Sequence, residues 1–555
     1  MVDRAQSWGI VPEYFGYTGE KVNASPAAVE AVLAALGATT DHPPRMKRED
    51  LPPGPCAPAP ERVWGWAVQL YALRSLNSWG VGDFGDLRHF GRSAKRRGAS
   101  LILLNPLGAQ VPTLPYQPSP YYSSSRRFLN AIYIDVEDLP GARRCATEIE
   151  PLRKAAQALN AHRLIDYDQV FQMKSKALET IYKAEPRPVG LAAWTKREGE
   201  ALRDFATFNA LAETLGPAWR SWPEGLRTPK GEAVEQKRAQ LHDRIAFHQW
   251  LQFHLDHQLE RAANEIGLVA DVPLGFASDS FDAWRWQHLL APDVRVGAPP
   301  DEFFPDGQDW GVPPFDPWKL RAAKCGPFVE AIRAAARHAT GVRLDHVMSL
   351  FRLFWIPNGM SASQGLYVRY PAEELLGYLA DESRRANAFV VGEDLGLVEP
   401  AVRRRLRKRG ALSYRLLWFE GESPRRWPHD AVGAVSTHDL PTVAGIWNLT
   451  EPDHRLHRLR KQLAEVVRMP DATPAVDVAV AAYRVLARGR TRIVLAQLED
   501  ALGVEERPNV PGTTTEFPNW RLALPAPLAD IERSPGARRI AAAMRRAGRT
   551  LTQAT

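Results

Sequence analysis

Four carboxylic acids stand at the ends of apolar segments that are far apart in the sequence. They are Asp271, Asp345, Glu393 and Asp439. A carboxylate next to buried apolar residues is costly to desolvate unless it is paired or protonated, so repeated placement of this kind indicates a function. If each apolar segment is a strand of one parallel barrel, the C-terminal ends of the strands meet on one face. We therefore expect the four acids to converge.

Two of these acids differ in their neighbours. Arg343 lies two positions before Asp345, and the period of two in a strand places both side chains on the same face. An adjacent guanidinium keeps an aspartate ionised and oriented, which suits a nucleophile. Glu393 follows apolar residues with no cation beside it, so desolvation should raise its pKa, which suits a general acid. Two carboxyl groups whose pKa values are driven apart in this way are the machinery of glycosidic bond cleavage.

Other interpretations of the polar motifs are weaker. Taken singly, each acid could also be a helix N-cap or a loop ion pair. The G-x-G-x-x-G pattern at Gly80–Gly85 does not directly follow a strand, and Asp83 and Asp86 would repel a pyrophosphate. The near-adjacent residues of Ser436–Asp439 cannot form a relay that needs separate segments. The stretch Asp301–Asp309 lacks the spacing and terminal Glu of a calcium loop, so we expect neither a nucleotide cofactor nor a metal.

The segments that must position the four acids alternate short apolar strands with amphipathic helices, which is typical of an α/β fold. Eight such units predict a (β/α)8 TIM barrel. The spacing of the strands also predicts mainly helical insertions at about 112–264 and 276–338. The predicted strands are Trp64–Tyr71, Ser100–Leu107, Gly267–Leu274, Gly341–Val347, Phe389–Leu395, Ser413–Leu417, Ala431–Asp439 and Arg492–Leu498.

The beginning of the chain has a different pattern. Ser25–Gly37 combines an N-cap serine, a proline at the first helical position, an apolar stripe and a closing glycine, which together predict a short helix. Residues 43–60 are rich in proline and charge, which favours an extended linker. We therefore expect residues 1–62 to form a short helical segment with its linker, and residues 63–555 to form the catalytic barrel.

Composition excludes several classes of protein. The 555 residues are 45% hydrophobic and 24% charged, which is an ordinary globular mixture. The net charge of +7 comes from scattered Arg rather than from a basic patch, so we expect no nucleic acid partner. Cys56, Cys145 and Cys325 have no CxxC spacing, which argues against disulfides and zinc. No secretion signal and no long apolar run is present, so we expect a soluble cytoplasmic protein with no membrane partner.

A series of separated motifs lies between residue 63 and about residue 525. They are Gln69-Leu70-Tyr71, Ser78 to Leu87, Ser119-Pro120-Tyr121, Ser124 to Asn130, Gly297 to Asp301, Gly307 to Gly311, Arg343 to His346, Gly392 to Gly396, Thr437-His438-Asp439, Pro511-Gly512 and Asn519-Trp520-Arg521. With these motifs the chain resembles the 4-α-glucanotransferases called amylomaltase or disproportionating enzyme, which form glycoside hydrolase family 77 in the α-amylase clan.

The resemblance implies specific roles for the acids. It implies that Asp345 is the nucleophile, that Glu393 is the acid/base and that Asp439 stabilises the transition state. It also implies a retaining mechanism without a cofactor, acting on α-1,4-glucans and maltooligosaccharides, and a loop that overhangs the acceptor groove. The residues that it places in contact with substrate are Tyr121, Asp271, Gln308, Trp310, Arg343 and His438.

Two other functions remain open at this point. One is a mainly hydrolytic α-glucan enzyme, and the other is a non-catalytic glucan-binding protein that keeps its aromatic surfaces. The chain has 17 Trp, and the apolar faces of glucose stack on flat rings. We expect Trp310 and Trp79 to act as sugar platforms, while most of the others pack in the core.

Overall fold

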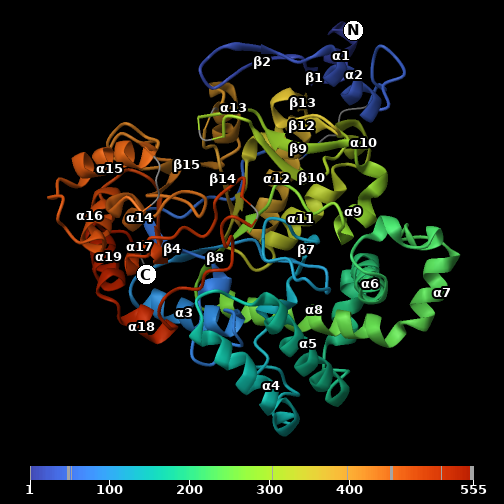
Figure 1. The fold of residues 1–555 in the computed structure, drawn as a ribbon, viewed down its shortest axis with the longest axis horizontal. Coiled ribbons are helices and arrows are strands. Elements are labelled where there is room, and N and C mark those ends of the chain that lie inside the picture. Colours follow the sequence, from blue (N-terminus) through green and yellow to red (C-terminus); the bar gives the residue numbers. More distant parts are fainter. Residues whose placement is uncertain are drawn as a thin grey trace.

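The barrel is the centre of the structure. A computed structural model describes residues 2–46, 51, 53–302, 304–396, 398–450, 454–513 and 515–550 (Figure 1). Eight parallel strands close on themselves in the order β11-β14-β15-β16-β17-β4-β5-β8, which confirms the predicted (β/α)8 barrel. The strands are β4 (Val63–Val68), β5 (Leu101–Leu104), β8 (Gly267–Val272), β11 (Gly341–Leu344), β14 (Phe389–Gly392), β15 (Leu412–Leu416), β16 (Ala431–Ala434) and β17 (Ile493–Gln497).

Each predicted strand segment overlaps a barrel strand, but several predictions extend too far. The clearest case is the segment Ala431–Asp439, where β16 ends at Ala434. Asp439 therefore does not close a strand, because it lies in the loop that follows β16. Apolar composition continues through Val435 and hides this end from sequence analysis.

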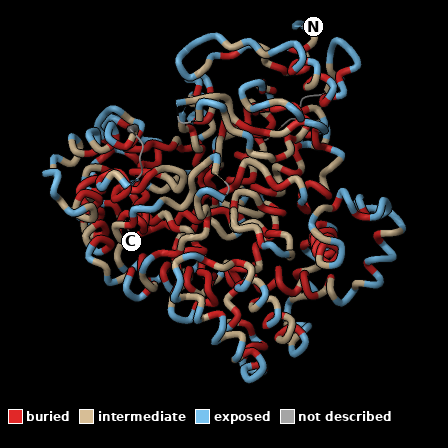
Figure 2. The backbone as a smooth tube through the Cα atoms, in the orientation of Figure 1, coloured by how far each residue is buried: buried red, intermediate tan, exposed pale blue. Residues whose placement is uncertain are grey.

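Alternation along the strands fills the barrel with apolar side chains. Inside, alternate strand residues form one buried cluster that includes Val63, Leu103, Val391, Leu416 and Leu495. The other faces of the strands pack against the helices, as expected for this fold. Figure 2 shows buried residues concentrated in the barrel and its helical cover, with exposed residues along the outer loops.

Helices cover the barrel and build the first insertion. The insertion contains the short hairpin strands β6 and β7 and the helices α4 to α7, and α8 leads back to β8. The bounds are α3 (Phe84–Arg96), β6 (Gly108–Ala109), β7 (Ser125–Leu129), α4 (Ala146–Ala158), α5 (Tyr167–Ala184), α6 (Leu191–Leu215), α7 (Glu232–Gln240) and α8 (His242–Ala263).

The elements outside the barrel that follow β8 are mostly helices. None of the described helices is both long and apolar enough to cross a membrane. The bounds are α9 (Phe281–Trp286), β9 (Val294–Ala298), β10 (Gln308–Val312), α10 (Pro317–Ala322), α11 (Gly326–Ala336), β12 (Arg352–Pro357), β13 (Leu366–Arg369), α12 (Ala372–Ala386), α13 (Pro400–Lys408), α14 (Val443–Asn448), α15 (His454–Val467), α16 (Ala475–Ala487), α17 (Leu498–Leu502), α18 (Leu528–Arg533) and α19 (Pro535–Arg546).

The segment before the barrel is more than a helix. The predicted helix is present as α2 (Pro26–Ala35), and the Ser25 hydroxyl accepts a hydrogen bond from its first turn. The structure adds α1 (Val2–Ser7) and three short strands that the sequence did not predict. Their two or three residues are too short to show periodicity. The strands are β1 (Ile10–Val11), β2 (Glu13–Phe15) and β3 (Lys21–Asn23). Of the predicted linker, residues 47–50 and Pro52 lie outside the described residues.

The G-x-G-x-x-G motif has a structural role at the start of α3. The Asp83 carboxylate accepts hydrogen bonds from the first turn, and Asp86 accepts one from the Asp83 backbone, which forms a capping box. The fully buried ammonium of Lys174 lies 3.9 Å from Asp83 and donates to the carbonyls of Ile132 and Ile134. Asp83 and Asp86, whose charges would repel a phosphate group, therefore cap a helix.

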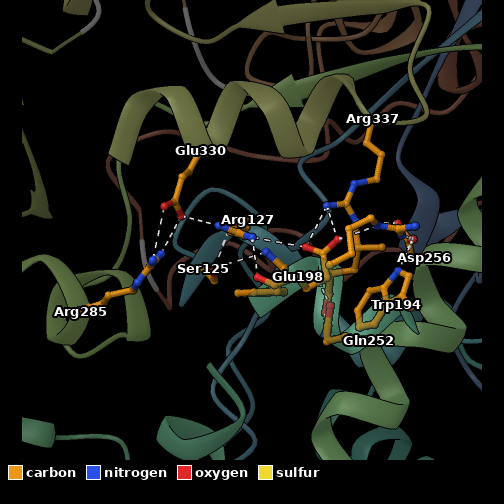
Figure 3. Close-up of polar contacts among 12 residues, drawn as sticks. Ser125, Arg127, Trp194, Glu198, Gln252, Asp256, Arg285, Glu330 and Arg337 are labelled. Atoms are coloured by element: carbon orange, nitrogen blue, oxygen red, sulfur yellow. Dashed lines mark hydrogen bonds and ion pairs between the residues drawn. The ribbon is translucent and has the colours of Figure 1, made fainter. Parts of the chain in front are cut away.

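An ion network docks the first insertion onto the barrel (Figure 3). Arg127 of β7 bridges Glu198 of α6, at 3.3 Å, and Glu330 of α11, at 2.7 Å. Arg337 lies 2.8 Å from Glu198 and 3.1 Å from Asp256 of α8. The side chain of Glu198 is only 4% exposed, so it needs the guanidinium groups around it, which also include that of Arg197 at 3.7 Å.

We predict that Glu198→Gln weakens this docking. Removing one charge from a buried ion pair leaves the partners uncompensated and typically costs about 3 kcal/mol or more. Hydrogen exchange of the α6 amides measures the opening free energy of this helix, which should fall in the variant. Glu200→Gln is the control, because Glu200 is exposed two residues away. Equal protection of α6 in both variants would contradict the prediction.

Candidate active site

The strand register brings Asp271 and Arg343 together on neighbouring strands. Asp271 of β8 pairs with Arg343 of β11 in the barrel. One guanidinium nitrogen of Arg343 lies 2.6 and 2.7 Å from the two Asp271 oxygens and 3.2 Å from Asp345 Oδ1. Asp345 follows β11 directly, so all three groups lie at the C-terminal end of the barrel. A single buried cation thus orients two carboxylates.

The electrostatic state of Asp345 differs from the expectation drawn from Arg343 alone. Burial raises the pKa of Asp345 to about 6, although Arg343 opposes this shift. The nearby acids Asp271, Glu393 and Asp439 raise it further. Arg343 binds Asp271 more closely than Asp345, a contact that the spacing of Arg343 and Asp345 in the sequence does not reveal. Near neutral pH a carboxyl group with this pKa is still mostly ionised.

Backbone amides hold Glu393 just beyond β14. Its Oε2 accepts a hydrogen bond of 3.0 Å from the N–H of His346, and its Oε1 accepts one of 2.8 Å from the N–H of Leu395. Burial raises the pKa of Glu393, while Arg343 and the two amides oppose the shift. The predicted direction is therefore right, but a cation is near. His346 has a φ of 43°, a sparsely populated conformation for a residue other than glycine.

Asp439 has the opposite electrostatic character. Burial works against its ionisation, but His438, whose Nε2 lies 3.2 Å from Oδ2, outweighs this effect. The amide of Asn509 donates a hydrogen bond of 2.6 Å to Oδ1, and together these groups hold the pKa of Asp439 below its usual value. The same contact with Asp439 raises the pKa of His438, although burial opposes the charged ring. Asn509 was not singled out from the sequence, although it stands just before the motif Pro511-Gly512.

Aromatic rings pack beside these acids. The Tyr121 hydroxyl donates a hydrogen bond of 2.6 Å to Asp271, and its ring lies 5.0 Å from the ring of His438 and 5.2 Å from that of Trp520. Trp520 has a φ of 62°, and its carbonyl accepts a hydrogen bond from Tyr167 of α5. The first insertion therefore contributes to the wall of the site. The sequence showed Trp520 only as part of a motif, with no signal for its position.

The two tryptophans expected to be sugar platforms have different surroundings. Trp310 of β10 lines a groove at the mouth of the barrel, and its ring centroid is 5.4 Å from that of His346. A bulge between Asp309 and Val312 interrupts the strand here, and Gly311 has a φ of 66°. Trp79 is 1% exposed and donates to Glu137, so the expectation for this residue was wrong. Its burial in the large apolar cluster could not be read from composition.

A groove of about 1390 Å³ runs over the barrel mouth. Below it lies a small polar chamber of about 20 Å³, lined by Asp271 and Arg343. Among the described residues no cluster of His, Cys, Asp and Glu is arranged to hold a metal ion. All nine residues predicted from the sequence thus line one of these two spaces. Those that line the groove are Tyr121, Gln308, Trp310, Asp345, Glu393, His438 and Asp439.

Known structures share the fold of this chain. The structure of amylomaltase from Corynebacterium glutamicum superposes with a TM-score of 0.84 and 25% identity, covering 98% of this chain and 99% of that one. Amylomaltase from Streptococcus agalactiae, solved in complex with acarbose, gives a TM-score of 0.76 at 19% identity, covering 88% and 100%. The second likeness shows the fold alone.

Sequence comparison defines the family. A 4-alpha-glucanotransferase of Mycobacterium tuberculosis is 40% identical over 528 residues, covering 84% of this chain and 72% of that protein. One from Haemophilus influenzae is 33% identical, covering 85% and 76%. The family model described as 4-alpha-glucanotransferase matches residues 68–528. The chain therefore belongs to the 4-alpha-glucanotransferase family of glycosyltransferases.

Proposed function

We propose that the enzyme moves a segment of an α-1,4-glucan to the 4-hydroxyl of an acceptor glucan or glucose by a retaining double displacement. The observation that carries this proposal is the placement of Asp345, Glu393 and Asp439 along one groove in three different electrostatic environments. Groups with different proton affinities can act as nucleophile, acid and charge stabiliser in one reaction.

In the first step Asp345 attacks the anomeric carbon of the donor. The glycosidic C–O bond breaks as Glu393 gives its proton to the leaving oxygen, and a covalent glycosyl ester forms on Asp345. The ionised form of Asp345 and the protonated form of Glu393 are required together. Burial favours the protonated form of Glu393, and Arg343 holds Asp345 in place.

In the second step the acceptor replaces the leaving group. Its 4-hydroxyl gives a proton to Glu393 and attacks the anomeric carbon, and the ester bond to Asp345 breaks, so the configuration is retained. Asp439 and His438 lie beside the groove, where they can hold sugar hydroxyls as charge develops on the ring. Transfer dominates hydrolysis only while water is excluded from the glycosyl-enzyme. The wall of the groove that contains Trp310 is suited to exclude it.

The product pattern from maltotriose distinguishes transfer from hydrolysis. We predict glucose together with maltooligosaccharides longer than maltotriose, because the glycosyl group passes to another sugar. Disproportionation leaves the number of reducing ends unchanged, whereas hydrolysis increases it. Chromatography with a reducing-end assay measures both quantities. Only products shorter than the substrate, with rising reducing ends, would instead establish a hydrolase.

Replacing the nucleophile tests its assignment. Asp345→Asn should lower the rate of disproportionation by about 10⁴-fold or more, because a neutral amide cannot form the glycosyl ester. The measurement is the initial rate of glucose release from maltotriose. Asp471→Asn is the control, since the Asp471 carboxylate is 80% exposed. Near-normal turnover by Asp345→Asn would remove Asp345 from this role.

The pH profile should show the effect of burial on Asp345. Its pKa is raised to about 6, so protonation removes the nucleophile as the pH falls through about 6. We therefore predict that the acid limb of kcat/KM for maltotriose has its midpoint near pH 6. An alkaline limb should follow as Glu393 loses the proton that it must donate, because only its protonated form acts as the acid. An acid limb near pH 4 would show that Asp345 titrates like an exposed carboxyl group.

A further inference from the structure

A second sheet lies above the barrel mouth and is assembled from three separate parts of the chain. Its strand order is β1-β13-β12-β9-β10. Strands β9 and β10 follow the barrel strand that carries Asp271, and β12 and β13 follow the one that precedes Asp345. The fifth strand, β1, comes from the segment before the barrel (Figure 1). The sheet therefore joins the N-terminal segment to β10.

Strand β10 contributes to the groove, although it is an edge strand. Among the described strands it pairs with β9 alone, and it carries Gln308 and Trp310. Arg295 of β9 forms an ion pair with Asp309 and donates to the carbonyls of Pro357 and Met360. The position of β10 thus depends on the strands behind it.

The N-terminal segment packs on these strands through two apolar clusters, and the larger one reaches β10. Its buried members include Trp8, Ile10 and Val32, and the same cluster contains Val312 of β10 and Trp355 of β12. Partly buried Trp310 packs against this cluster. Apolar contact is therefore continuous from the first residues of the chain to the groove.

Trp8 is the anchor of this contact. It is 5% exposed, and its indole donates to the Thr40 carbonyl. Its ring lies 6.1 Å from that of Trp318 in an edge-to-face arrangement, and the Trp318 indole donates to the Trp8 carbonyl. The next strand is paired as well, since Ile10 and Val368 are partners between β1 and β13. Trp8 therefore fixes the entry of the chain into β1.

We propose that the N-terminal segment, residues 2–42, supports the wall of the groove at β10, that the acceptor binds against this wall, and that Trp8 is a positioning residue for Trp310. Protein interiors are close-packed, so the loss of a large buried ring shifts its neighbours. A looser β10 would hold the acceptor less firmly and admit water to the glycosyl-enzyme. The proposal rests on the transfer reaction described above, but it concerns the partition of the intermediate rather than its formation.

The experiment compares formation of the intermediate with its partition. In Trp8→Ala we expect the ratio of hydrolysis to transfer and the KM for glucose as acceptor each to rise about threefold or more, which corresponds to a small loss of binding energy. The rate of the initial burst of 4-nitrophenol from a 4-nitrophenyl maltooligosaccharide, which reports the first turnover and hence formation of the intermediate, should stay within about twofold, since the acids are untouched. A purely structural defect would lower the rates of 4-nitrophenol release, transfer and hydrolysis together and leave the ratio of hydrolysis to transfer unchanged.

Three further variants make the result decisive. Phe15→Ala is the matched control, because Phe15 belongs to the same segment but is 72% exposed. Trp8→Phe should restore most of the wild-type ratio. If Trp8→Ala does not fold, Ile10→Ala takes its place, because Ile10 is 1% exposed in the same cluster. A wild-type ratio and acceptor KM in the folded variants would overturn the proposal, whereas a wild-type enzyme without transfer products would instead refute the transfer reaction.

Discussion

The contact of Arg343 with Asp271 and Asp345 is the interaction on which the site depends. All three groups lie where the barrel excludes most water, and a buried charge without a partner is very costly. The paired arrangement makes burial tolerable, and it also fixes the nucleophile relative to the barrel. Tyr121 satisfies a remaining lone pair of Asp271, so the network extends to the groove wall. A loss at any one position would leave charges uncompensated at the others.

The barrel supplies this interaction through strand register, and the sequence reveals much of it. A period of two placed Arg343 and Asp345 on one face, and apolar segments ending on acids located Asp271 and Glu393. These features are local, because a strand and its end need only a few residues to define them. The eight strands could be predicted for the same reason. Asp439 was found as an acid, although its position in a loop beyond β16 was not.

What could not be predicted arises from contacts between distant segments. Asn509 and Trp520 lie in irregular backbone, and only the folded chain shows that they meet Asp439 and Tyr121. Strand β1 is two residues long, and it exists because β13 offers it an edge. The burial of Trp79 likewise depends on how the helices cover the barrel. In each case the local sequence is compatible with several structures and tertiary packing selects one.

Burial raises the pKa of Asp345, and the guanidinium of Arg343 offsets only part of this rise because it is shared with Asp271. The shortest contacts of the guanidinium go to Asp271, and Asp345 receives a longer one. A carboxylate stabilised by a full bidentate pair would be a weaker nucleophile, because attack on carbon must break those hydrogen bonds. A carboxylate with no cation would be protonated in so dry a site. The intermediate arrangement keeps Asp345 ionised near neutral pH without strong stabilisation. Asp271 is therefore needed as much to limit the hold of Arg343 on the nucleophile as to anchor that cation in the barrel.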